Sequence, residues 1–377
     1  MRRTDRERLG KPAEYENGDV AERDLERKLQ VASPRTWELE RELLDDLDET
    51  TYGIGWWKPH PDDRRRILIA DHLVRSTQSV RINLIEAGLH LLEYLDSSDR
   101  IAKRMSRVVS GDGELAYPKP LSPYDLLPER FSTLHVCGFF RALASALDCL
   151  AAVVIGVLAI PQPILRADLL GLHRWLRGES HPRQTRLPIH TAFAIELEEI
   201  TRRAGPAGWS EWILDYRNML VHRGRRTELN ILSLESHVLD SAGYPIPLVV
   251  PTLLLAKDPH LSDVQAHLVS AVNVIREDAT GLLSAALEST RHLVDAVGAS
   301  LLEKWMNRRA GKISVAQPSE QWPTLVMTHK SFEGYSSAKL AISSDAMMTA
   351  PSGLERLRAA CLDSKSRSLW DEGLSGT

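Results

Sequence analysis

Apolar residues recur every three or four positions along most of the chain, which is the period of an amphipathic α-helix. In residues 64–109 this repeat runs from Ile67 to Leu95 and stops before Gly111-Asp112-Gly113. Residues 131–160 are apolar on nearly every face and end at Pro161, which is typical of a long, largely buried helix. The pattern therefore predicts a mainly helical protein.

Shorter stretches with the same period predict further helices. They cover residues 21–29, 36–47, 167–177, 189–204 and 210–223. Residues 262–309 predict either one long helix or two, with Gly281 as the point of a break.

The one stretch with the pattern of strands lies between these helices. Residues 228–234 and 246–255 are rich in β-formers and flank a turn-like segment at residues 241–245. Pro247 and Pro251 lack an N–H group, so they would confine such a hairpin to a sheet edge. The predicted fold class is all-α, a helical bundle with additional N-terminal helices and a small β-hairpin insertion near residues 228–256.

Changes in composition suggest four parts. Residues 1–62 form a charged appendage, and residues 63–127 form a helical region followed by a Pro-rich loop. Residues 128–310 form the main helical bundle, and residues 311–377 form a polar, Ser-rich tail.

Composition and charge narrow the function classes. The 377 residues are 43% hydrophobic and 26% charged, which is ordinary for a globular protein. The net charge of -4 gives no whole-chain signature of a nucleic-acid partner, so any such site depends on local charge. The three cysteines show no CxxC spacing, which indicates a reducing, cytoplasmic setting without a zinc site. We therefore predict no metal and no cofactor.

The two segments that could carry a secretory or membrane signal are the N-terminus and the most apolar helix. Residues 1–10 contain no apolar core, so they do not resemble a secretory signal. The longest apolar run, residues 150–160, is too short to cross a bilayer, and Arg141 and Asp148 precede it in the same helix. We predict a buried core helix and no membrane association.

The candidate functional residues are concentrated in residues 210–223. Ser210 is a suitable N-cap and Gly224 a suitable helix stop, so the segment predicts a helix of about three turns. A helical residue advances roughly 100° around the axis, which places five apolar residues on one core-facing arc. These are Trp212, Ile213, Tyr216, Met219 and Leu220.

The opposite arc of this helix is polar. It carries Glu211, Asp215, Asn218 and His222, whereas Arg217 lies roughly 140° from His222. Leu214 and Val221 form an apolar strip between Arg217 and this polar line. Because an exposed strip of this kind favours a partner, we predict a homodimer in which each Arg217 approaches the other copy's His222.

The residue types at this helix suit metal-free cleavage of RNA. An imidazole such as His222 moves protons near neutral pH, and a guanidinium such as Arg217 binds phosphate oxygens bidentately. Asn218 can orient a hydroxyl group, and a basic patch follows directly for substrate binding. The patch consists of Arg223, Arg225 and Arg226. Asp148 and Asp215 are predicted to orient Arg217 or His222 from a second layer.

The run Arg217-Asn218-x-x-x-His222 resembles the R-x4-H motif of the HEPN domain family, including the frequent Asn after the Arg. The resemblance implies a helical bundle that commonly dimerises through this helix. Many HEPN domains are metal-independent ribonucleases of toxin–antitoxin and defence systems, and others are scaffolds or nucleotide binders. In one toxin subgroup the motif continues as His-x-Tyr. Here Arg223-Gly224 follows His222, so the resemblance does not extend to that mode of regulation.

The sequence thus favours a metal-independent endoribonuclease, with RNA and a second copy of the chain as partners, and an antitoxin or defence-system protein as a further partner. Two alternatives stay open. The first is a non-catalytic HEPN module that binds nucleotides or serves as a scaffold. The second is a helical interaction protein in which the spacing of Arg217 and His222 is accidental.

Overall fold

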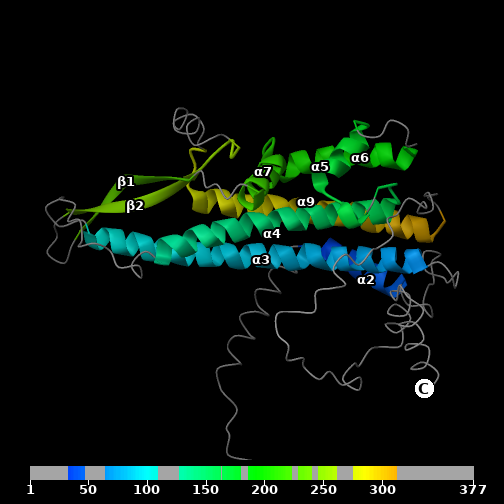
Figure 1. Cartoon of the computed structure of the whole chain (residues 1–377), viewed down its shortest axis with the longest axis horizontal. Helices are drawn as coiled ribbons and strands as arrows, with labels where there is room; N and C mark the ends of the chain where they lie inside the picture. The colour runs from blue at the N-terminus through cyan, green and yellow to red at the C-terminus, as the bar shows by residue number, and fades with distance from the viewer. Residues whose placement is uncertain are drawn as a thin grey trace, which may run out of the picture. The chain divides into compact units, whose positions relative to one another are not determined.

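The computed structural model describes residues 33–46, 64–108, 127–162, 164–179, 186–222, 228–239, 245–260 and 275–311. Helices make up most of these residues, which confirms the all-α class (Figure 1). They are α2 (Pro34–Asp46), α3 (Arg64–Val108), α4 (Leu127–Leu158), α5 (Leu169–Arg177), α6 (Pro188–Ala204), α7 (Trp209–His222) and α9 (Ala279–Arg309). A short 3-10 helix, η1 (Ile164–Arg166), precedes α5.

The predicted hairpin is present and is longer than expected. Strands β1 (Glu228–Leu239) and β2 (Pro245–Leu255) pair antiparallel as a two-stranded sheet, with an irregularity between Leu234 and Ser236. Pro247 pairs with His237 and Pro251 with Leu232. In a sheet of two strands both are edge strands, so each proline can be accommodated without an N–H group.

Most helix ends lie within a few residues of the predicted positions. Gly281 does not break the helix, because it lies inside α9, which begins at Ala279 after the non-helical residues 275–278. Asp278 caps this end, since its carboxylate accepts a hydrogen bond from the Thr280 N–H at 3.1 Å. Residues 261–274 and the helix predicted at residues 21–29 lie outside the described residues.

The described residues divide into two compact units. Unit 1 contains residues 33–34, 81–108, 127–146, 201–222, 228–239, 245–260 and 275–295. Unit 2 contains residues 35–46, 64–80, 147–162, 164–179, 186–200 and 296–311. Each unit thus combines part of the predicted 63–127 region with part of the predicted 128–310 bundle. The sequence does not reveal this because helical periodicity shows which face is buried but not which partner buries it.

In unit 1 the first part of α4 packs against the second part of α3. Gly138 makes the approach close, since a Cβ atom built on it would lie 2.2 Å from Nε2 of His90. On its other side α4 presents Phe139 and Phe140, both fully buried and packed edge to face at 5.6 Å. This aromatic end of α4 is the surface on which α7 rests.

In unit 2 the helices close around the apolar end of α4. Gly156 faces Leu73 of α3, and Trp175 of α5 packs edge-on against His190 of α6 at 5.1 Å. His190 is buried, and its Nε2 lies 3.0 Å from the carbonyl oxygen of Leu158. A buried imidazole with both ring nitrogens engaged is satisfied as a core residue.

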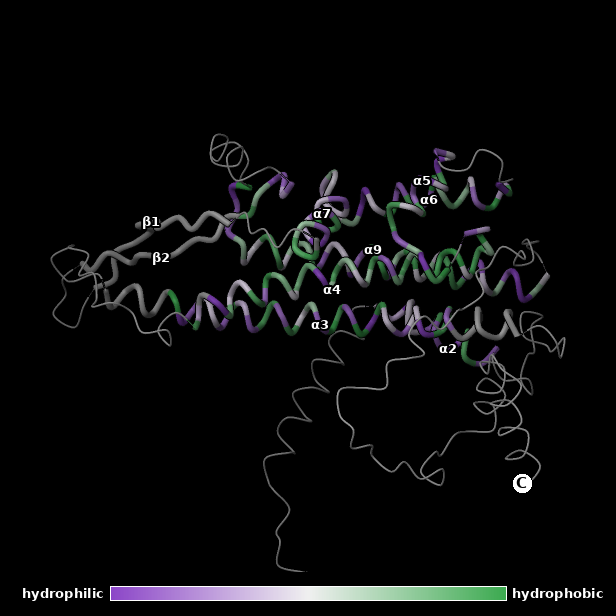
Figure 2. The backbone as a smooth tube through the Cα atoms, viewed as in Figure 1, coloured by the Kyte–Doolittle hydropathy of each residue, from purple (hydrophilic) through white to green (hydrophobic). Residues whose placement is uncertain are grey.

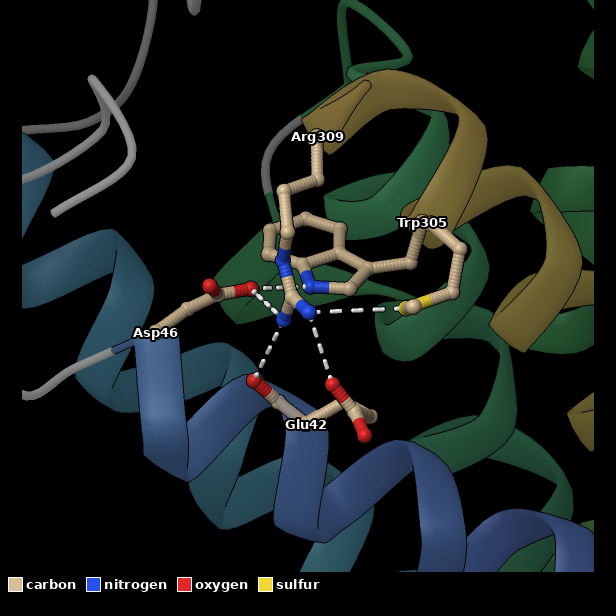
Figure 3. A network of polar contacts seen from close by, with 5 residues as sticks. Glu42, Asp46, Trp305 and Arg309 are labelled. Atoms are coloured by element: carbon tan, nitrogen blue, oxygen red, sulfur yellow. Dashed lines mark hydrogen bonds and ion pairs between the residues drawn. The ribbon is translucent and has the colours of Figure 1, made fainter. Parts of the chain in front are cut away.

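Helix α2 is held to the end of α9 by a buried polar network in unit 2 (Figure 3). The Arg309 guanidinium donates to the carboxylates of Glu42 at 2.8 Å and Asp46 at 2.6 Å. The Trp305 indole N–H donates to the same Asp46 oxygen. Desolvation by burial raises the pKa of Asp46, and the Arg309 and Trp305 hydrogen bonds oppose that rise.

Helix α4 is the most apolar helix among the described residues, as its colouring in Figure 2 shows. In that part of the chain, the stretch Arg130–Leu158 is the one helix long and apolar enough to cross a membrane by length and composition. In its most apolar window 78% of the helix is buried inside the protein, as in the core helix of a folded domain.

Candidate functional site

Helix α7 begins one residue earlier than predicted, and Ser210 is not its N-cap. The helix starts at Trp209, because Gly208 adopts a left-handed backbone conformation with φ of 79° and its carbonyl accepts the Trp212 N–H at 3.0 Å. The Ser210 hydroxyl instead donates to the Glu211 carboxylate at 2.9 Å. The prediction missed this because Gly208 and Ser210 are both suitable residues before a helix.

The predicted core arc of α7 is confirmed. Ile213, Tyr216, Met219 and Leu220 are all buried, and Trp212 is half-buried. The Tyr216 ring stacks on Phe140 of α4, with ring centroids 4.5 Å apart and planes 18° from parallel. Trp212 packs edge to face on Phe140 at 5.2 Å, so two aromatic side chains fix the rotation of α7 about its axis.

The same two side chains hold the end of the hairpin. The Tyr216 hydroxyl accepts the backbone N–H of Ala256 at 2.7 Å, and the Trp212 indole N–H donates to the carbonyl of Ala256 at 3.0 Å. Ala256 is buried, so both of its backbone groups depend on such partners. The segment after β2 is therefore attached to the helix that carries the motif.

The predicted apolar dimer strip on α7 is wrong in one of its two residues. Leu214 is only 1% exposed and belongs to the core, whereas Val221 is 50% exposed. Leu214 lies about 100° from Ile213 on the helix, and the core around α7 is broad enough to cover both positions. One exposed valine is too small an apolar surface for a dimer interface, so Leu214 and Val221 do not form the predicted interface strip.

The motif residues lie on the remaining surface of α7. Arg217 and Asn218 are half-exposed. The Nε atom of Arg217 is buried, so this residue lies closer to the core than the prediction assumed. His222 is the last residue of α7, and its side chain lies outside the described residues, as do Arg223, Arg225 and Arg226. The helix places residue 222 on the same line as Asp215, seven positions earlier.

Asp215 has a partner that the sequence analysis did not identify. Its Oδ1 atom lies 3.4 Å from Nε2 of His260, and both side chains are partly exposed. His260 follows β2 in a local turn, where its N–H donates to the Asp258 carboxylate at 2.8 Å. The Asp258-Pro259 pair signals such a turn, but only the attachment of Ala256 to α7 brings His260 beside Asp215.

Asp148 of α4 lies at the start of helix α5. Its Oδ1 atom accepts the N–H of Leu169 at 3.2 Å, at the N-terminus of α5. Asp168 accepts the Gly171 N–H at 2.7 Å at the same helix end. Negative charge there is favoured by the helix dipole, which accounts for both carboxylates.

Among the described residues, no three His, Cys, Asp or Glu side chains are grouped so that they could hold a metal ion. A scan against protein-family models, a search of curated proteins and a search of solved structures each returned no match to this chain.

Proposed function

We propose that the chain is a metal-independent endoribonuclease of the HEPN type that acts through α7. The 2′-hydroxyl oxygen of RNA attacks the adjacent phosphorus while the bond from phosphorus to the 5′-oxygen breaks. The products are a 2′,3′-cyclic phosphate and a 5′-hydroxyl end. His222 transfers a proton in this reaction, and Arg217 stabilises the charge that develops on the phosphorane oxygens.

The observation that carries the proposal is the second imidazole beside the motif helix. Transesterification needs a base for the 2′-hydroxyl proton and an acid for the departing 5′-oxygen. His222 can serve in one of these roles. His260, paired with Asp215 on the line that leads to residue 222, supplies a candidate for the other within the same chain.

Substrate binding is assigned to the arginines. Asn218 lies one turn before residue 222 on the same side of α7, and Arg217 lies roughly 140° around the helix from it. Arg223, Arg225 and Arg226 continue the chain with three positive charges. Guanidinium groups bind phosphate by paired hydrogen bonds and hold successive phosphates of a single strand. RNA is therefore the proposed substrate, and an antitoxin or defence-system protein is a proposed partner in the cytoplasm.

The decisive experiment incubates purified protein with single-stranded RNA in EDTA and compares wild type with His222→Ala. We expect the substitution to reduce cleavage at least about 100-fold, the lower range for loss of an acid–base group. His292→Ala is the matched control, because His292 is an exposed histidine of α9 in unit 1 whose side chain is 63% accessible. The cleaved ends should carry 2′,3′-cyclic phosphate.

Further variants test the roles of His260, Asp215 and Arg217. His260→Ala should also reduce cleavage by at least about 100-fold, whereas Asp215→Asn, which keeps the imidazole, should reduce it less. Arg217→Lys should restore little of the activity lost in Arg217→Ala, because lysine lacks the planar fork. If folded His222→Ala cleaves like wild type, the catalytic proposal fails. A non-catalytic HEPN module that binds nucleotides or serves as a scaffold, or a helical interaction protein, then takes its place.

A further inference from the structure

The outer surface of α3 in unit 1 carries large apolar side chains that the fold leaves uncovered. Ile82, Leu89 and Leu92 are 54%, 48% and 52% exposed. Ile82 and Leu89 are seven positions apart and lie on one line of the helix, and Leu92 lies three positions further. They face away from the buried residues Leu84, Ala87 and Leu91 of the same helix.

Helix α4 carries a matching stripe. Leu127, Phe131 and Leu134 are spaced four and three positions apart, so they share one face, and they are 37%, 45% and 54% exposed. Among the described residues, twelve large apolar side chains are exposed, and six of them lie on these two stripes. Such a concentration is uncommon on a surface that contacts only water.

The two stripes belong to one continuous face. His90 of α3 and His135 of α4 meet at the seam between the helices, where their Nδ1 atoms are 3.0 Å apart. The Phe131 ring lies 6.5 Å from the His135 ring, and Leu89 directly precedes His90. We call the six apolar residues on both sides of this seam the α3–α4 face.

The charges beside this face have opposite signs on its two helices. Between Ile82 and Glu93, the exposed charged residues of α3 are Glu86 and Glu93. Asp96 and Arg100 follow as an ion pair of 2.6 Å and contribute no net charge. On α4 the exposed charges beside the stripe are Arg130 and Arg141. The face therefore has an acidic helix and a basic helix.

We propose that a second copy of this chain binds the α3–α4 face in a twofold-symmetric dimer. A twofold axis that places α3 of one copy on α4 of the other brings apolar stripe against apolar stripe and acidic helix against basic helix. The symmetry repeats every contact, so the six apolar side chains become twelve buried ones. The proposal stands on this surface alone and does not depend on the function proposed for α7.

The test uses charge reversal with the full-length protein. Glu93→Arg removes the net negative charge of the α3 stripe and places an arginine opposite the basic helix of the partner, and Arg130→Glu does the converse on α4. Each variant should therefore dissociate with a Kd at least about tenfold weaker than wild type. When the two variants are mixed, each reversed residue faces an opposite charge. The mixture should therefore form a heterodimer. Sedimentation velocity detects the dimer, and native mass spectrometry with one isotope-labelled chain distinguishes the heterodimer from either homodimer.

Leu89→Glu and Leu134→Glu should abolish the dimer, and Ile195→Glu is the matched control, since Ile195 of α6 is 68% exposed in unit 2. The proposal is overturned if the wild-type protein is a monomer at about 50 μM, or if Leu134→Glu leaves the dimer intact. It is also overturned if a mixture of the Glu93→Arg and Arg130→Glu variants stays monomeric. If the Leu89 and Leu134 variants lower thermal stability in a monomeric protein, another segment of the same chain covers the face.

Discussion

The hydroxyl of Tyr216 accepts the backbone N–H of Ala256 at 2.7 Å, which connects the motif helix α7 to the segment that follows strand β2. The two residues are far apart in the sequence, and Ala256 is buried. His260 lies four positions after Ala256 and reaches Asp215 on the same helix. The position of His260 beside the motif thus depends on a hydrogen bond made by a core tyrosine.

Removing this hydroxyl should destabilise unit 1 without disturbing the aromatic packing. Tyr216→Phe keeps the ring that stacks on Phe140 but leaves the buried Ala256 N–H without that acceptor. The expected loss of unfolding free energy is about 1–3 kcal/mol, measured by urea or thermal denaturation. If the proposal for His260 is right, the variant should also lose activity because the imidazole is less well positioned. Unchanged stability would show that the N–H has another acceptor.

Leu214 and Val221 should respond in opposite ways to the same substitution. Leu214→Asp buries a carboxylate in the core, so the variant should fail to give a cooperatively unfolding protein. Val221→Asp places the charge on the surface and should change stability by no more than about 0.5 kcal/mol. Circular dichroism melts of both purified variants make the comparison. A well-folded Leu214→Asp protein contradicts the assignment of this residue to the core.

Removing the Arg309 guanidinium from the buried network at α2 should lower the stability of the protein by an amount that depends on pH. In Arg309→Met the Asp46 carboxylate loses a guanidinium at 2.6 Å, and the expected cost near neutral pH is about 3–5 kcal/mol. Arg35→Met on α2 removes a more exposed ion pair, the one with Glu38, and should cost less than about 1 kcal/mol.

The sign of the pH effect in Arg309→Met follows from Asp46. Burial already raises the pKa of this carboxyl, and losing the Arg309 hydrogen bond, which lowers it, raises it further. A group whose pKa is raised by folding contributes stability at acid pH that is lost as the pH rises through the folded value. Relative to wild type, the variant should therefore recover stability as the pH is lowered from about 7.5 to about 5. A defect that stays constant over this range contradicts the role of Asp46.

His190 should make unit 2 sensitive to acid. Its Nδ1 atom accepts the Leu187 N–H at 3.2 Å, so Nε2 carries the proton that faces the Leu158 carbonyl. Burial lowers the pKa of His190 below its ordinary value of 6.5, and a second proton would break the bond from Leu187. The stability it provides is present above that ordinary value and is lost as the pH falls from there through the lowered pKa of the folded state. His190→Gln should flatten this part of the stability–pH curve, whereas the exposed His292→Gln should not.

Several features could be predicted from the sequence because they depend on near neighbours in the chain. The bounds of α3, α5 and α6, the hairpin, and the buried arc around Tyr216 follow from helical and strand periodicity and from Gly and Pro at their ends. These signals arise within a few turns of backbone, so a single sequence contains them. They also identify α7 as a helix that carries Arg217 and Asn218 on its less buried side.

Other features were decided by tertiary structure, because they depend on which distant segments pack together. The burial of Leu214, the capping of α5 by Asp148 and the division of the long helices between two units have no local signature. The pairing of Asp215 with His260 joins residues separated by an entire hairpin and requires Ala256 to be bound by α7. Periodicity predicts which side of a helix or strand is buried. Which distant residue packs against that side depends on how the whole chain folds.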